Sequence, residues 1–524
     1  MTGTVSATAV KAVSTKPWAS VWPERRSISR LVYLAAAASL IAHFVARNQY
    51  GAFRDELYFI ACGNHLAFGY IDQPPLVAVS AWLSRVLFGN TLGGFRFFPA
   101  LAMGCSVLLT GWLTRELGGG RFAQALAALT VSLAPLYLAF GSFLSMNAFE
   151  PLLWLGCSCI LVRILKGGDN RLWLAFGAVA GIGLQNKHTI LMFGFALVLG
   201  LLVARDSKHL LNKWFFLGGA LALLIFLPNL IWEIQHHWPQ IEVVRNCQKL
   251  KNMHAGVLSF LGEQALFVNP VASPVVVAGL AWLFFSERGR RFQCLGWAYL
   301  VVIAVVIILN GKTYYPTPYY PILCAAGAIP MEMSKRWFRA AYVWAILLSG
   351  LAMLPFGAPI LPLETLVRYQ NALPLQNAVQ VEQDSEGEIH QLYADMLGWP
   401  DMAATVATVY HRLPPSDQAK CAILAGNYGE AGAIDLFGPE YGLPGAISGH
   451  NNYYLWGPRG YTGEVVILFG ERAESTKKLF AEVEQAATIS ARRTAIAENH
   501  LPVYVCRRPK APLEDLWPLL KFIE

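Results

Sequence analysis

Long apolar runs dominate the first two-thirds of this chain and constrain its fold more than any other feature. A helix needs about 20 consecutive apolar residues to cross the hydrocarbon core of a bilayer. Only 14% of the 524 residues are charged, whereas roughly 25% is typical of soluble proteins. The sequence therefore predicts a polytopic α-helical membrane protein with about eleven spans. The runs lie at 31–46, 97–114, 122–140, 149–165, 172–186, 189–204, 214–232, 271–286, 292–309, 318–333 and 338–355.

Basic residues between the runs predict the orientation of the spans, because loops rich in lysine and arginine stay in the cytoplasm. We expect residues 1–30 to form a cytoplasmic arm. A signal peptide is the weaker alternative, since no convincing small-residue cleavage site follows the basic residues of the arm. The same clustering accounts for the net charge of +8, so no nucleic-acid partner is predicted. The segments predicted to lie outside are 47–96, 141–148, 187–188, 233–270, 310–317 and everything after about 356.

The composition changes beyond about residue 356. Short strand-like runs at 422–425, 465–469 and 503–506 alternate with helix-like stretches such as 477–487. This pattern predicts a soluble α/β domain over 356–524 on the outer side, after a transmembrane domain over 31–355. Cys421 and Cys506 lie at the edges of two predicted strands and fit either a disulfide or two separate buried thiols.

Three carboxylates follow the first apolar run, and burying them in hydrocarbon would be costly. Asp55 and Glu56 suit general-base catalysis, while a solvated pair bridged to Arg54 is the alternative. Asp72 precedes Gln73 and two prolines, which favour an extended approach and then a helix start. Asp72 is therefore either a functional residue or the cap of the helix that begins after the prolines, which is expected to lie in the membrane interface.

A fourth acidic residue opens the run 149–165. Proline favours the first helical position, so Pro151 places Glu150 at or near the N-cap. The helix dipole favours an ionised carboxylate there. Both a helix cap and a second active-site acid fit this position.

Two outer segments combine cations with polar neighbours. The turn 187–188 contains Lys187 and His188, and the segment 310–317 contains Lys312. Each lysine taken alone is explained by a side chain that snorkels toward water. Together with tyrosine hydroxyls, two lysines would form an anion pocket that suits a lipid-linked phosphate. The candidates in the second segment are Lys312, Tyr314, Tyr315 and Tyr320.

The outer segment 233–270 carries histidines at positions 236, 237 and 254. No carboxylate pair stands at metal-ligand spacing beside them, so a metal is not expected there. A divalent ion held by Asp55, Glu56 or Glu150 stays an alternative. No other cofactor is predicted.

In their order along the chain, the polar motifs resemble those of glycosyltransferase family 39. This GT-C family includes bacterial relatives of the dolichyl-phosphate-mannose protein mannosyltransferases and of the lipid A aminoarabinose transferases. The resemblance covers roughly residues 31–355, and the later stretches 426–433 and 454–458 are similar to the outer domain of one bacterial branch. The motifs are Arg54-Asp55-Glu56-Leu57-Tyr58-Phe59, Gly69–Leu76, Asn147–Leu152, Asn186-Lys187-His188-Thr189, and Lys312-Thr313-Tyr314-Tyr315 with Pro318 and Tyr320-Pro321.

The resemblance implies inverting transfer of a sugar from a polyprenyl-phosphate donor to an acceptor hydroxyl on a lipid, protein or glycan. The reaction is expected at the periplasmic face of the bacterial inner membrane. Asp55 matches the presumed catalytic base, and Glu56 and Glu150 are expected to orient donor or acceptor. Some relatives carry lysine at the position of Gln73, so phosphate binding here is expected to rest more on two lysines. The expected substrate-binding set is Asp72, Gln73, Asn147, Lys187, His188, Lys312, Tyr314, Tyr315 and Tyr320.

Two other functions compete with this hypothesis. A transporter or flippase of lipid-linked sugars would need polar residues deep inside several spans, and the charges cluster at span ends instead. A non-catalytic scaffold would leave the acidic and basic motifs of the outer segments unexplained.

Overall fold

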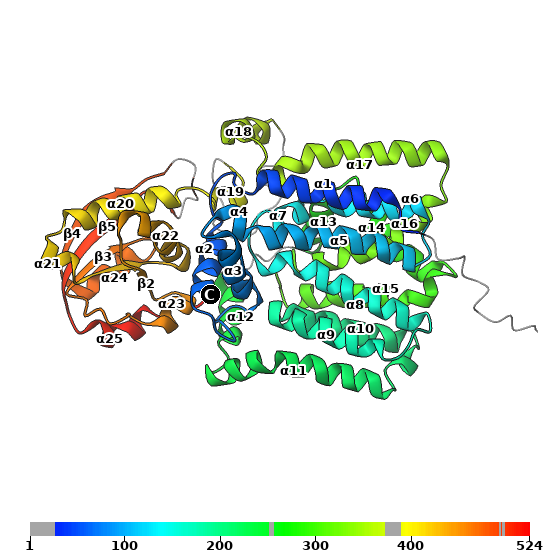
Figure 1. The fold of residues 1–524 in the computed structure, drawn as a ribbon, viewed down its shortest axis with the longest axis horizontal. Helices are drawn as coiled ribbons and strands as arrows, with labels where there is room; N and C mark the ends of the chain where they lie inside the picture. The colour runs from blue at the N-terminus through cyan, green and yellow to red at the C-terminus, as the bar shows by residue number, and fades with distance from the viewer. Residues whose placement is uncertain (1–26, 251–255, 373–388, 492–493, 495–497) are drawn as a thin grey trace, which may run out of the picture.

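The fold is described from a computed structural model that covers residues 27–250, 256–372, 389–491, 494 and 498–524. A bundle of apolar helices forms one end of the molecule, and a smaller sheet domain forms the other (Figure 1). The predicted cytoplasmic arm lies outside the described residues, except for its last few positions. The predicted class, a helical membrane protein with a C-terminal α/β domain, is confirmed.

The apolar runs form the helices of the bundle. Among the described residues, five helical stretches are long and apolar enough to cross a membrane, or six if one bent pair counts as a single span. Several further apolar helices are shorter, so the predicted count of about eleven stays a prediction. The bundle helices are α1 (Arg30–Ala46), α5 (Phe97–Glu116), α6 (Arg121–Ser132), α7 (Pro135–Phe140), α8 (Glu150–Leu165), α9 (Leu172–Asn186), α10 (Thr189–Val203), α11 (Lys213–Gln235), α13 (Val257–Val268), α14 (Ser273–Phe285), α15 (Gln293–Ile308), α16 (Tyr320–Glu332) and α17 (Arg336–Gly357).

One predicted span is not a continuous helix. The run 122–140 is divided into α6, which ends at Ser132, and α7, which begins at Pro135. Proline lacks the N–H that a continuing helix needs, and it keeps Ala134 extended. The expectation of one helix here was therefore wrong. The break places α7 beside the cavity described below.

Shorter elements lie between the bundle and the sheet domain (Figure 1). The helix expected after the tandem prolines is present as α3, but its N-cap is Pro75. Asp72 instead accepts a hydrogen bond from the Tyr58 hydroxyl at 2.7 Å, so no capping by Asp72 is seen. These elements are α2 (Arg54–Asn64), α3 (Leu76–Phe88), α4 (Leu92–Phe95), α12 (Pro239–Leu250), α18 (Leu363–Asn371) and α19 (Gln391–Ala394).

The C-terminal domain is built on one five-stranded sheet of order β2-β1-β3-β5-β4. Strands β2, β1 and β3 are parallel, whereas β5 and β4 are antiparallel additions at one side. The strands are β1 (Cys421–Ala425), β2 (Ala446–Ser448), β3 (Val465–Phe469), β4 (Phe480–Ile489) and β5 (Leu501–Pro509). The helices are α20 (Trp399–Arg412), α21 (Pro415–Gln418), α22 (Tyr428–Phe437), α23 (Asn451–Trp456), α24 (Ala473–Thr476) and α25 (Leu513–Leu516).

Two local expectations for this domain are resolved by the sheet. Residues 477–487 were expected to be helical, but most of them lie in β4, because pairing with β5 overrides a weak helix propensity. Cys421 and Cys506 are free thiols. They lie on β1 and β5 with β3 between them, and they pack into cores on opposite faces of the sheet. The alternative of two separate thiols is therefore the one observed.

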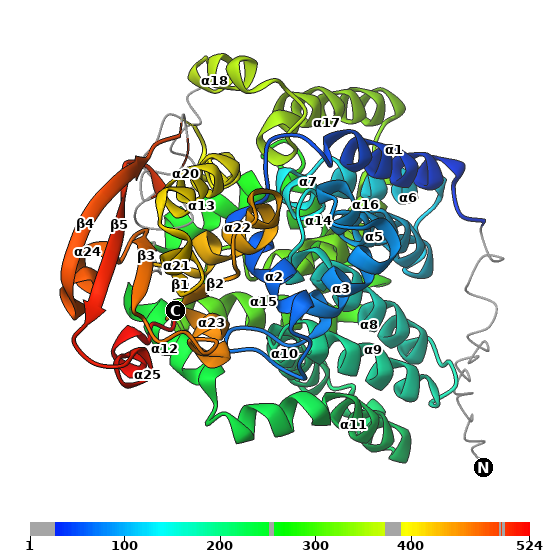
Figure 2. The ribbon, with the colours of Figure 1, turned by 60° about the vertical axis from the view of Figure 1, so that its left-hand side comes forward.

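The two parts of the molecule share a hydrophobic core. Leu57 and Tyr58 of α2 pack in the same cluster as Ile423 and Ile467 of the sheet. Both views place α22 beside α2 (Figure 2). The sheet domain is consequently joined to the segment that carries the acidic motif.

Candidate active site

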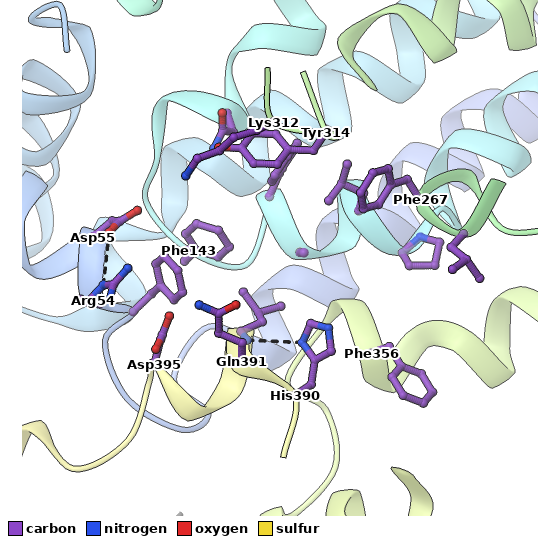
Figure 3. Close-up of a pocket in the computed structure, with 18 of the residues that line it drawn as sticks. Arg54, Asp55, Phe143, Phe267, Lys312, Tyr314, Phe356, His390, Gln391 and Asp395 are labelled. Carbon is purple, nitrogen blue, oxygen red and sulfur yellow. Dashed lines mark hydrogen bonds and ion pairs between the residues drawn. The ribbon is translucent and has the colours of Figure 1, made fainter. Parts of the chain in front are cut away.

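A cavity of about 190 Å³ lies where one end of the bundle meets the segment 390–395. Most of its wall is apolar and comes from α7, α13 and α17, from α19, and from loop residues before α2 and after α7. Polar groups gather on two sides (Figure 3). The apolar lining is Phe53, Pro135, Leu136, Ala139, Phe140, Phe143, Leu266, Phe267, Met353, Phe356 and Leu392. The polar lining is Arg54, Asp55, Asn147, Lys312, Tyr314, His390, Gln391 and Asp395.

Asp55 reaches the cavity from the first turn of α2, and its side chain is 38% exposed. The Tyr428 hydroxyl donates a hydrogen bond to Asp55 Oδ1 at 2.8 Å. Arg54 Nε lies 3.9 Å from the same oxygen (Figure 3). Among the described residues, none donates a hydrogen bond to Oδ2. One carboxylate oxygen is therefore held, and the other is available to a ligand.

Glu56 is the neighbour of Asp55, yet it lies outside the cavity. Its carboxylate is fully buried and receives Arg96 Nη2 at 2.9 Å and Nε at 3.2 Å. The backbone N–H groups of Leu144 and Phe53 also donate to it, at 2.9 and 3.2 Å. This placement argues against the direct catalytic role expected from the sequence. Glu56 instead ties the start of α2 to α5 and to the loop before α8.

A second polar network stands behind another part of the cavity wall. Lys187 Nζ donates to Asn147 Oδ1 at 2.7 Å and to Glu150 Oε2 at 3.2 Å. It also lies 4.7 Å from the centre of the Tyr315 ring and 5.5 Å from that of Tyr314. Since Asn147 and Tyr314 line the cavity, the network is continuous with its wall.

The electrostatics of this network keep Lys187 charged. Glu150 is the first residue of α8, as expected, and it also accepts a hydrogen bond from the Thr189 hydroxyl. Burial disfavours the charged form of Lys187, but Glu150 together with Tyr314 and Tyr315 outweighs that effect, and the pKa of Lys187 is raised. The lysine therefore stays protonated and can attract an anion.

Two predicted residues near the start of α3 are not brought to the cavity. Asp72 is bound by Tyr58, as described above. Gln73 is fully buried, and its amide nitrogen lies 3.6 Å from Cys62 Sγ. Neither side chain lines the cavity, so the expectation that they contact substrate there is not supported by this geometry.

Two further predicted residues also make contacts elsewhere. His188 Nε2 is 3.0 Å from Asn229 Oδ1 on α11. The Tyr320 hydroxyl donates to Gln264 Oε1 of α13 at 2.6 Å within the bundle core. Their side chains support the helices around the cavity rather than its wall.

The structure adds residues of the cavity wall, and one residue that contacts Asp55, that sequence reasoning missed. His390, Gln391 and Asp395 belong to a short segment without a recognisable motif, so no local signal could have found them. Tyr428 lies in the stretch 426–433, whose resemblance to an outer domain was a usable signal. Its contact with Asp55 could not be inferred, because the two residues are 373 positions apart.

No group of three or more potential metal ligands occurs among the described residues. His236 stacks on Trp232 with ring centres 4.0 Å apart, and its Nδ1 is 2.8 Å from the Trp232 carbonyl oxygen. His254 lies outside the described residues. A divalent ion at Asp55, Glu56 or Glu150 stays a prediction.

Comparisons with known proteins first define the class. The fold is that of the GT-C membrane glycosyltransferases, and the resemblance found in the motifs is confirmed. The family model described as dolichyl-phosphate-mannose-protein mannosyltransferase matches residues 72–232. The crystal structure of ArnT from Cupriavidus metallidurans bound to undecaprenyl phosphate is similar, with a TM-score of 0.60 and 14% identity over 90% of this chain and 97% of that one. Its apo structure has a TM-score of 0.58 at 14% identity over the same shares of the two chains.

Within this class, the chain is similar in sequence to two enzymes from strains of Pseudomonas fluorescens. Both are named undecaprenyl phosphate-alpha-4-amino-4-deoxy-L-arabinose arabinosyl transferase 1. One is 23% identical over 65% of this chain and 62% of its own length. The other is 29% identical over 55% of this chain and 53% of its own length. The chain thus spans less than two-thirds of the length of these relatives.

Proposed function

We propose that this protein transfers a sugar from a polyprenyl-phosphate-linked donor to an acceptor hydroxyl, with inversion at the anomeric carbon. The observation that carries the proposal is the cavity itself. A half-exposed carboxylate, Asp55, and the cations Lys312 and Lys187 flank a largely apolar space. The relatives act on, or bind, undecaprenyl phosphate according to their names.

In the proposed reaction, Asp55 acts as general base. Its Oδ2 accepts the proton of the acceptor hydroxyl as the acceptor oxygen bonds to the anomeric carbon. The bond from that carbon to the phosphate oxygen breaks at the same time. The proton ends on Asp55, and the bonding electrons leave with the lipid phosphate.

The cations at the cavity wall would stabilise the leaving group. Negative charge grows on the phosphate in the transition state, and preorganised cations there lower the barrier. Lys312 lines the cavity, and Lys187 is held by Asn147 and Glu150 just behind it. The phenylalanines and leucines of the wall suit the polyprenyl chain.

We further propose that the site faces the periplasm from the bacterial inner membrane. The basic loops predict this orientation. Residues 31–355 would then form the catalytic membrane domain, and residues 356–524 a periplasmic domain. The acceptor is a lipid, a protein or a glycan with a free hydroxyl.

Mass spectrometry of envelope glycolipids and glycoproteins tests this proposal. A strain that lacks the gene should lose one sugar modification, and the wild-type gene should restore it. Asp55→Asn should fail to restore it while the variant protein accumulates in the membrane. Full restoration by Asp55→Asn would overturn the assignment of the base. Release of free polyprenyl phosphate only when acceptor is added separates transfer from transport.

A further inference from the structure

Asp55 is held in place by a residue of the C-terminal domain. Tyr428 opens α22, and its hydroxyl donates to Asp55 Oδ1 at 2.8 Å. Arg54 Nε is more distant from the same oxygen, at 3.9 Å. A carboxylate on a short side chain rotates unless a donor fixes it. Tyr428 supplies that donor at Oδ1, and among the described residues none donates a hydrogen bond to Oδ2.

The Tyr428 side chain is itself fixed. It is buried, and its ring lies 4.8 Å from the Tyr58 ring and 4.5 Å from the His450 ring, centre to centre. Its backbone N–H donates to His450 Nδ1 at 3.3 Å. The phenol therefore presents its hydroxyl to Asp55 from a rigid surround, as a positioning group requires.

Two glycines of α22 allow the helix to approach α2. A methyl group added at Gly429 would lie 2.5 Å from Arg54 Cγ, and one added at Gly432 would lie 2.9 Å from the carbonyl carbon of Leu57. Residues three apart share one face of a helix. The stretch 428–432 thus forms a docking surface that sets the distance from Tyr428 to Asp55.

We propose that Tyr428 is a positioning residue for the base Asp55, so that the C-terminal domain completes the active site. This inference rests on the proposed function of Asp55. A contact that merely joins the two domains would show the same packing of glycines. It would not need a phenolic hydroxyl directed at the catalytic carboxylate.

Tyr428→Phe separates these two roles, because it removes the hydroxyl and keeps the ring. We expect kcat to fall about 10- to 100-fold, the factor that corresponds to a lost hydrogen bond to a charged group. KM for the donor and the Kd for undecaprenyl phosphate should stay within twofold of the wild type. Tyr410→Phe is the matched control, since the Tyr410 hydroxyl donates to Gln418 O within the C-terminal domain. It should leave kcat unchanged.

Gly429→Ala provides the comparison for a purely structural effect. It should lower both the melting temperature and kcat, because Arg54 obstructs the added methyl group. Tyr428→Phe should lower kcat with little change in melting temperature. A wild-type kcat in Tyr428→Phe, or a loss matched by weaker undecaprenyl phosphate binding, would overturn the inference. If the wild-type protein forms no glycosylated product, the proposed function fails instead.

Discussion

The two polar sides of the cavity are built in different ways. The anion side, formed by Asn147, Glu150, Lys187 and Tyr314, joins residues of the bundle, and Lys187 bonds to partners 40 and 37 positions away. The base side, formed by Asp55 and Tyr428, joins residues 373 positions apart. The bundle can therefore assemble the anion side alone, whereas the base side also needs the C-terminal domain.

The two sides also differ in exposure. The side chains of Glu150 and Lys187 are 5% and 13% exposed, and they form an ion pair with each other. Asp55 is 38% exposed, with one oxygen held. A closed network stabilises the structure and is costly to break, while an open carboxylate can be changed at little cost to folding.

The neighbouring carboxylates Asp55 and Glu56 give the largest expected contrast. Glu56→Gln leaves Arg96 buried without its counter-charge, which should cost about 3–5 kcal/mol of folding free energy. Asp55→Asn, its matched amide, should leave stability unchanged and reduce transfer about 10²- to 10⁴-fold. Thermal unfolding in detergent and product assays measure both effects. Equal stability of the two variants would contradict the positioning role of Glu56.

Removal of the central cation tests the anion side. Lys187→Met leaves the carboxylate of Glu150 buried, and we expect a loss of about 2–3 kcal/mol because some water can enter. Binding of undecaprenyl phosphate, measured with the purified protein, should weaken as well.

Lys166→Met is the control for Lys187→Met, because Lys166 pairs with Glu116 at 2.9 Å away from the cavity. It should lower the melting temperature without weakening undecaprenyl phosphate binding. Unchanged binding in Lys187→Met would remove Lys187 from the proposed phosphate site.

Gly432→Ala should weaken the docking of α22 without touching the anion side. Its methyl group meets the Leu57 backbone, and overpacking of this kind costs about 1–3 kcal/mol. We expect a lower kcat with unchanged undecaprenyl phosphate binding. Gly219→Ala on α11, where the added methyl group meets no neighbour, should be neutral or slightly stabilising. Equal behaviour of the two variants would show that close packing at Gly432 is unimportant.

The smallest expected effect is a pH dependence of the domain that carries Tyr428. Burial raises the pKa of Glu430 on α22, and the adjacent Glu498 raises it further. Burial raises the pKa of Glu498 as well. The folded state then holds protons more tightly than the unfolded state. This contribution to stability is present at acidic pH and is lost as pH rises through the folded-state values.

Melting temperatures measured between about pH 5 and pH 8 test whether stability falls as pH rises. The wild-type melting temperature should decline by a few degrees across the range, and Glu498→Gln should flatten the decline. A melting temperature that rises with pH in the wild type and is unaffected by Glu498→Gln would contradict the raised pKa values of Glu430 and Glu498.

Much of the fold could be predicted because it depends on local patterns. Apolar runs of sufficient length become helices wherever they stand, and Pro151 places Glu150 at the start of α8 as expected. The failures came where distant contacts decide. Residues 480–487 became strand because β5 pairs with them. The segment 390–395 reaches the cavity without any motif.

The sequence by itself determined the membrane class, the order of the motifs and the presence of acidic and basic groups on one predicted face. The resemblance matched Asp55 to the catalytic base and gave Glu56 an orienting role, but adjacent residues of the same charge do not reveal which of them is buried. Only the tertiary structure decided that. Arg96 takes Glu56 into the core, while Tyr428 of a distant domain holds Asp55 at the cavity. The physical reason is that burial and hydrogen-bond partners are properties of the folded chain, not of residues adjacent in the sequence.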